Sequence, residues 1–224
     1  MTKINKYLNF ILPIIFLAFC FPANAQFPSV PGMPALDSIL GGSKSTSAVD
    51  LKAGKNDLVK AFFVSFESYA QSLDLLTQSL GLDADSKKIQ QALADSKNPN
   101  TSEGDRMANA IKATTEATKA VEAKSKAGTI ILDVKAKEKY AKSIPFAVKG
   151  LIGTLELKPK TMQMVSGIQA NPIMAIQDLG ALSKVIPELP SYITTIVSVT
   201  KLIVTGAEAN NIETKELKST LGKF

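Results

Sequence analysis

The chain has 224 residues, of which 45% are hydrophobic and 21% are charged. This composition is typical of a globular protein rather than a disordered one, and the length suits one domain. Histidine and tryptophan are absent and Cys20 is the only cysteine, which excludes a Ser-His-Asp site and removes the preferred ligands of zinc, copper and haem. Arg106 is the only arginine and the lysines are scattered among acids, a pattern that argues against nucleic-acid binding.

The first 25 residues have the three parts of a secretory signal peptide. Two lysines precede an apolar run over residues 7–21. The run is followed by the small residues Ala23 and Ala25, which fit the narrow subsites of a signal peptidase. We therefore expect cleavage between Ala25 and Gln26 and export of the mature chain.

Two other interpretations of this segment are weaker. A lipoprotein signal would make Cys20 the first mature residue, but the bulky Phe19 stands before it, where a small side chain is required. An uncleaved anchor would need ~20 apolar residues, and the run has only about 15 and contains Pro13. Cleavage removes Cys20, so the mature chain has neither cysteine nor histidine.

This lack of cysteine favours a bacterial periplasmic or secreted protein, since exported eukaryotic domains commonly carry disulfides. Loss of the two signal lysines lowers the net charge from +6 to about +4, which allows only weak attraction to anionic surfaces. Without histidine or cysteine, the mature chain has no side chain whose ordinary pKa lies near neutral pH. We therefore expect no enzymatic activity, no catalytic or metal-binding residues and no cofactor.

Residues 26–55 are predicted to form a flexible leader, because proline, glycine and serine recur through them. The leader has one apolar patch, Leu36, Ile39 and Leu40, with helical spacing. We expect that patch to dock on the body of the protein or on a partner. Residues 56–224 are then expected to form a single all-helical domain.

The clearest core element is a predicted helix over Asn56–Leu80, with Asn56 as its N-cap. Apolar residues recur along it at intervals of three and four, which gives one continuous stripe. A shorter helix is predicted over Asp85–Lys97 and ends before Pro99, because the residue that precedes a proline avoids the helical conformation.

A second long helical stretch is predicted from Ser102 to Lys126, with small residues on its apolar face. Gly128 marks a break or a kink, after which another helix is predicted from about Ile130 to Ile144, where Pro145 interrupts it. We expect this stretch and the helix over Asn56–Leu80 to form a long hairpin, with shorter C-terminal helices packed against it.

The C-terminal third contains four short apolar segments separated by prolines. The predicted helices cover Phe146–Leu157, Thr161–Gln169, Pro172–Ile186 and Ser191–Ala209. The β-branched run over residues 193–199 favours a strand by propensity alone. We predict a helix there, because no partner strand of similar quality exists elsewhere in the sequence. The tail from Asn211 is expected to be a short charged helix or a frayed end.

Three phenylalanines suggest an apolar pocket. Phe62, Phe63 and Phe66 lie within little more than one helical turn, and the apolar stretch Leu179–Val204 suggests such a pocket as well. Core packing is the simpler explanation, because large apolar residues at helical spacing are most often buried in a core. The stretch itself is interrupted by lysines, prolines and a glutamate, so we do not expect it to span a membrane.

Three other patterns carry little chemical specificity. Ser198 and Lys201 have the Ser-x-x-Lys spacing of penicillin-recognising enzymes, but the partner motifs of that family are missing. The carboxylates of Glu67 and Asp74 share one helix face about 10 Å apart, beyond the separation used in glycoside hydrolysis. Asp83-Ala84-Asp85 begins like a calcium loop, but a lysine stands where the next oxygen ligand is needed.

The sequence thus predicts an all-α bundle of five to eight helices after a disordered leader. It favours an exported bacterial protein without enzymatic activity, which binds a partner protein or an apolar ligand in the cell envelope. Two alternatives stay open: a carrier of a lipid or other apolar molecule, and a secreted membrane-active protein. No nucleic acid is expected as a partner, and no transmembrane span is expected in the mature chain.

Overall fold

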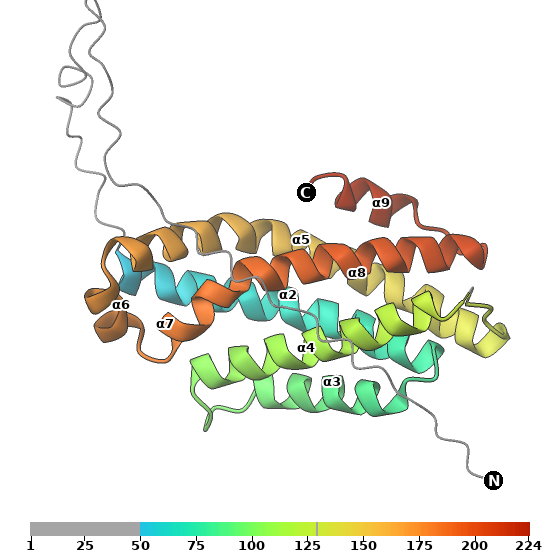
Figure 1. Cartoon of the computed structure of the whole chain (residues 1–224), viewed down its shortest axis with the longest axis horizontal. Helices are drawn as coiled ribbons and strands as arrows, with labels where there is room; N and C mark the ends of the chain where they lie inside the picture. The colour runs from blue at the N-terminus through green and yellow to red at the C-terminus, as the bar shows by residue number, and fades with distance from the viewer. Residues whose placement is uncertain (1–49, 129) are drawn as a thin grey trace, which may run out of the picture. The chain divides into compact units, whose positions relative to one another are not determined.

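The computed structural model describes residues 50–128 and 130–224. The predicted signal peptide and the leader patch at residues 36–40 lie outside these ranges. The described residues form helices and no strand (Figure 1), which confirms the all-α prediction. The elements are α2 (Leu51–Ser79), α3 (Asp83–Ser96), α4 (Glu103–Lys126), α5 (Val134–Ala170), α6 (Pro172–Leu179), α7 (Leu182–Val185), the 3₁₀ helix η1 (Ile186–Glu188), α8 (Leu189–Ala209) and α9 (Lys215–Leu221).

Helix α2 begins at Leu51 rather than at Asn56. Its N-cap is Asp50, whose side chain accepts a hydrogen bond from Ala53 N at 2.9 Å. The helix then passes through Gly54, where a Cβ would lie 2.9 Å from Met164 Sδ of α5. The helix-favouring residues around Gly54, together with the Asp50 cap and the contact with α5, make the last residues of the predicted leader helical.

The central pair of helices is α2 and α5, which run antiparallel and side by side (Figure 1). Ser65 Oγ of α2 donates to Gly150 O at 3.1 Å and lies 2.8 Å from Thr154 Oγ1. Gly150 and Gly153 lack side chains where the two backbones cross, so the helices approach closely. The predicted hairpin of α2 with residues 102–144 is therefore wrong, because the main partner of α2 is α5. Helix α4 packs on α3 and α8 and makes a smaller contact with α2.

Helix α5 continues through two prolines, so the predicted interruption at Pro145 is wrong. Each proline removes one backbone hydrogen bond, but a buried face runs across the first of them, including Ile144, Ala147 and Leu151. Pro145 itself is exposed. Burial of that face keeps the helix continuous, as tertiary packing often does against local propensity.

Two further helix predictions are confirmed, whereas the predicted gap between Leu157 and Thr161 is wrong, because α5 continues through it. Ser102 caps α4 by accepting a hydrogen bond from Asp105 N at 3.1 Å. Residues 193–199 lie within α8, which confirms the helix rather than the strand. α8 buries one face containing Tyr192, Ile196 and Val199 against its neighbours.

By length and composition, Leu182–Ala209 is the one helical stretch of the described ranges that is apolar enough to cross a membrane. About half of its most apolar window, 44%, is buried inside the protein. The core helix of a globular protein meets the same criteria, and α8 packs against α4 and α5.

Candidate functional site

The short helix α6 is fixed at both ends by local sequence. Asn171 is its N-cap and accepts a hydrogen bond from Met174 N at 3.3 Å, and Pro172 occupies the first turn. Gly180 ends the helix with a φ of +56°, a conformation that glycine adopts without steric cost. The helix is thus confined to eight residues at one end of the bundle (Figure 1).

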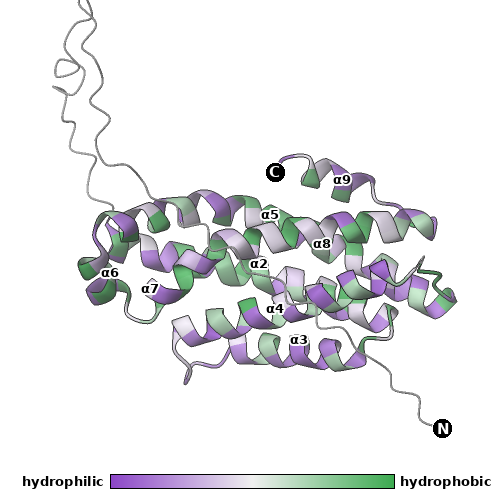
Figure 2. Cartoon of the chain, viewed as in Figure 1, coloured by the Kyte–Doolittle hydropathy of each residue, from purple (hydrophilic) through white to green (hydrophobic). Residues whose placement is uncertain are grey.

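Helix α6 carries three large apolar side chains that are more than half exposed. Ala175 and Leu179 point inward and are fully covered. Ile173, Met174 and Ile176, here called the α6 surface, are 73%, 51% and 65% exposed. Figure 2 shows green, hydrophobic bands on α6. A cluster of large exposed apolar side chains is typical of an interaction site, because leaving it in water costs free energy.

A groove of about 580 Å³ adjoins the α6 surface and runs between α6, α7 and the start of α4. Its apolar lining includes Ile176, Ala108 and Val185. Its charged lining consists of Asp105, Glu188 and Lys184. Among the ion pairs of the described residues, none involves these three charges.

The three phenylalanines proposed to line a pocket lie in the core or at its edge. Phe62 and Phe66 are fully buried and stacked, with ring centroids 6.0 Å apart, and Phe62 also packs on Tyr192 at 5.3 Å. Phe63 is half-buried beneath the guanidinium of Arg106, 5.0 Å from its ring centroid. None of the three lines the groove beside α6.

The carboxylates singled out in the sequence hold helices together. Asp74 Oδ1 accepts hydrogen bonds from Ser86 Oγ at 2.5 Å and from Gln90 Nε2 at 3.0 Å, which joins α2 to α3. Glu67 of α2 pairs at 3.7 Å with Lys97, the residue that follows α3. Each acid therefore has a structural partner.

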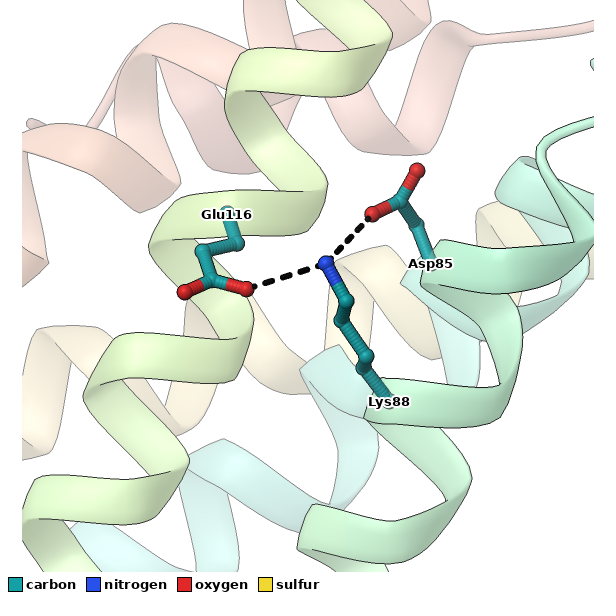
Figure 3. Close-up of polar contacts among 3 residues, drawn as sticks. All are labelled: Asp85, Lys88 and Glu116. Carbon is teal, nitrogen blue, oxygen red and sulfur yellow. Dashed lines mark hydrogen bonds and ion pairs between the residues drawn. The ribbon is translucent and has the colours of Figure 1, made fainter.

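A similar bridge joins α3 and α4. Lys88 Nζ lies 3.1 Å from Glu116 Oε2 and 3.4 Å from Asp85 Oδ1 (Figure 3). The hydrogen bond to Glu116, and then that to Asp85, raise the pKa of the Lys88 ammonium. Asp85, the third residue of the motif that begins like a calcium loop, thus pairs with a lysine. No group of three potential metal ligands occurs within residues 50–128 and 130–224.

Ser198 and Lys201 are both exposed on α8. No hydrogen bond links these two side chains among the contacts of the described residues, and neither lines the groove beside α6.

The hydroxyls of the buried Tyr69 and Tyr140 bind to the backbone of α8. They donate hydrogen bonds to Ile196 O at 3.2 Å and to Ile203 O at 3.0 Å.

The α6 surface was not found from the sequence. Its helix start was predicted correctly, but residues 172–186 were treated as one packed helix. The available signal was Gly180, which ends α6 early and leaves an element too short to bury Ile173, Met174 and Ile176 together.

Comparison of the chain with protein-family models, with curated proteins and with solved structures finds no match.

Proposed function

We propose that this chain is an exported bacterial protein without enzymatic activity, which binds another envelope protein through the α6 surface and the adjoining groove. The observation that carries this proposal is the exposure of Ile173, Met174 and Ile176 on one short helix. Covering these side chains removes apolar area from water, which is the main driving force of protein association.

The charges of the groove indicate the kind of segment that would bind. Asp105 and Glu188 supply two negative charges and Lys184 one positive charge around an apolar floor. A partner segment with apolar side chains followed by a basic residue complements this lining. An anionic membrane complements it poorly, because the two carboxylates would repel the headgroups.

The composition supports a binding role rather than catalysis. Residues 26–224 contain no histidine and no cysteine, so the usual nucleophiles and acid-base groups are reduced to hydroxyls, carboxylates and lysines. In the described part of the chain, Asp74 and Glu116 are engaged in bridges between helices, and Asp85 pairs with Lys88 within α3.

Site-specific photo-crosslinking in the bacterial envelope tests the proposal. A photoreactive residue in place of Met174 should crosslink one other protein, and the same residue in place of the exposed Val64 should not. Replacing Glu188 and Asp105 with lysine should weaken that crosslink, since both changes invert the charge of the groove.

Three outcomes would contradict the proposal. A crosslink to a second copy of the chain would assign the α6 surface to self-association, and a crosslink to lipid would favour a membrane-active protein. Equal yields from positions 174 and 64 would show that α6 has no preferred role.

A further inference from the structure

A second pocket is formed by residues that lie far from α6 in the sequence. It lies between the end of α4, residues just after α4, and α8. Its volume is about 400 Å³, within the range of small-molecule sites. The lining side chains are small or aliphatic: Ser125, Gly128, Ile130, Leu202, Thr205, Gly206 and Ala209. We call this the α4–α8 pocket.

Asn210 holds the wall of the α4–α8 pocket in place. Its Nδ2 donates to Ile130 O at 2.9 Å and to Gly206 O at 2.8 Å, and its Oδ1 accepts from Leu132 N at 3.0 Å. One buried side chain thus fixes the segment before α5 to the end of α8. The pocket is therefore preformed, which lowers the cost of binding.

Two hydroxyls and two carbonyl oxygens of the lining are already hydrogen-bonded within the protein. Ser125 Oγ donates to Val121 O at 2.9 Å, and Thr205 Oγ1 donates to Lys201 O at 3.1 Å. The carbonyl oxygens of Ile130 and Gly206 accept from Asn210. The pocket thus presents mainly hydrocarbon and engaged polar groups, which favours an apolar ligand group over a sugar or a nucleotide.

Lysines flank the walls of the α4–α8 pocket. Lys124 and Lys126 stand on either side of Ser125 in the last turn of α4, and Lys201 precedes Leu202 on α8. Neighbours along a helix point about 100° apart, so these lysines lie beside the lining rather than within it. All three are exposed, and none forms an ion pair within the described ranges.

One negative charge close to the pocket is paired. Glu208 precedes the lining residue Ala209, and its carboxylate pairs with Lys218 of α9. Two exposed apolar side chains follow the lining residue Ile130 in the sequence: Ile131 and Val134 are 89% and 85% exposed. An apolar pocket bordered by free ammonium groups complements a molecule with a hydrocarbon chain and one anionic head.

We propose that the α4–α8 pocket binds a single-chain anionic amphiphile of the fatty-acid class. The hydrocarbon chain occupies the pocket, and its carboxylate lies near Lys124, Lys126 and Lys201. This site is separate from the α6 surface, so the loss of either binding activity leaves the other to be measured.

Calorimetric titration of the full chain with monomeric dodecanoate, below its micelle concentration, tests the site. Ala209→Phe or Thr205→Trp fills the pocket from an exposed helix position and should weaken binding at least about tenfold. Ala94→Phe, an exposed alanine of α3 outside the pocket, is the matched control and should bind as the unaltered chain does. Circular dichroism of each variant establishes that it is folded.

The head group is tested with a second ligand. Replacing Lys124, Lys126 and Lys201 with glutamine should weaken dodecanoate binding about tenfold and leave binding of dodecanol unchanged. If both pocket-filling variants are folded and bind dodecanoate normally, the α4–α8 pocket is not the binding site. If the unaltered chain binds dodecanoate and dodecanol with equal affinity, the lysines do not recognise an anionic head group. Binding to phosphatidylglycerol vesicles without binding to monomeric dodecanoate would overturn the single-chain ligand in favour of membrane lipid.

Discussion

Gly150 of α5 lies directly against the backbone of Tyr69 in α2: a Cβ at position 150 would lie 2.9 Å from Tyr69 Cα. This distance is shorter than the van der Waals contact of two carbon atoms. The close approach of the helices also allows the Ser65 hydroxyl of α2 to donate a hydrogen bond to Gly150 O at 3.1 Å. The closeness of the two longest helices thus depends on a missing side chain.

Gly150→Ala is therefore expected to lower the free energy of unfolding by about 1–3 kcal/mol, because the methyl group meets backbone that cannot move aside. Chemical denaturation measures this change. Gly54→Ala is the matched control in the same pair of helices, since its methyl group meets only the flexible end of Met164. That change should be neutral or stabilise by up to about 1 kcal/mol through helix propensity. Equal losses in both variants would contradict the close-contact explanation.

Asn210→Ala is expected to destabilise the protein by about 1–3 kcal/mol. The change leaves Leu132 N and the carbonyls of Ile130 and Gly206 without their partner. Asn109→Ala is the control, because Asn109 is exposed within α4 and alanine favours a helix. Hydrogen exchange at Leu132 should accelerate in the Asn210 variant alone; unchanged exchange there would show that Asn210 does not hold this segment.

The helical class and most helix starts could be predicted because their causes are local. Ser102 and Asn171 carry capping side chains, and the apolar period of α2 is visible in the sequence. The pairing of helices could not be predicted, because it depends on contacts between distant residues such as Ser65 and Thr154. The continuity of α5 through Pro145 has the same cause, since burial of its apolar face outweighs a local breaking signal.

The candidate sites were harder to predict for a related reason. Exposure of Ile173 and Ile176 cannot be read from residue type, because the same residues would be buried in a longer helix. The α4–α8 pocket is built from small residues far apart in the chain, such as Ser125 and Gly206, which give no motif. The aromatic residues did attract attention in the sequence, but Phe62 and Phe66 are part of the core.

Stability is expected to fall in alkaline solution. Burial raises the pKa of the phenols of Tyr69, Tyr140 and Tyr192 above the usual value near 10. The folded state keeps these phenols neutral while the unfolded state releases their protons, so their stabilising contribution is complete below about pH 10 and is lost as the pH rises further. Urea denaturation between about pH 8 and 11 measures the decline.

Tyr140→Phe should make that alkaline decline shallower, because it removes one of the three titrating groups. The same change removes the hydrogen bond to Ile203 O, so stability near neutral pH should fall by about 0.5–1.5 kcal/mol. A slope equal to that of the unaltered chain would show that Tyr140 does not contribute to the alkaline loss.

Export provides the last prediction, at residues outside the described ranges. If the signal peptide is cleaved as the sequence predicts, N-terminal sequencing of the exported protein begins at Gln26. Ala25→Leu should block processing, because the bulky side chain does not fit the small-residue subsite, and Ala18→Leu in the apolar run should be processed normally. Cys20→Ser distinguishes the two maturation routes. It should not affect cleavage after Ala25, whereas a lipoprotein would lose its acylation site. If Cys20→Ser fails to mature, the unaltered protein is a lipoprotein and not a free exported protein. Its mature chain would then begin with an acylated Cys20.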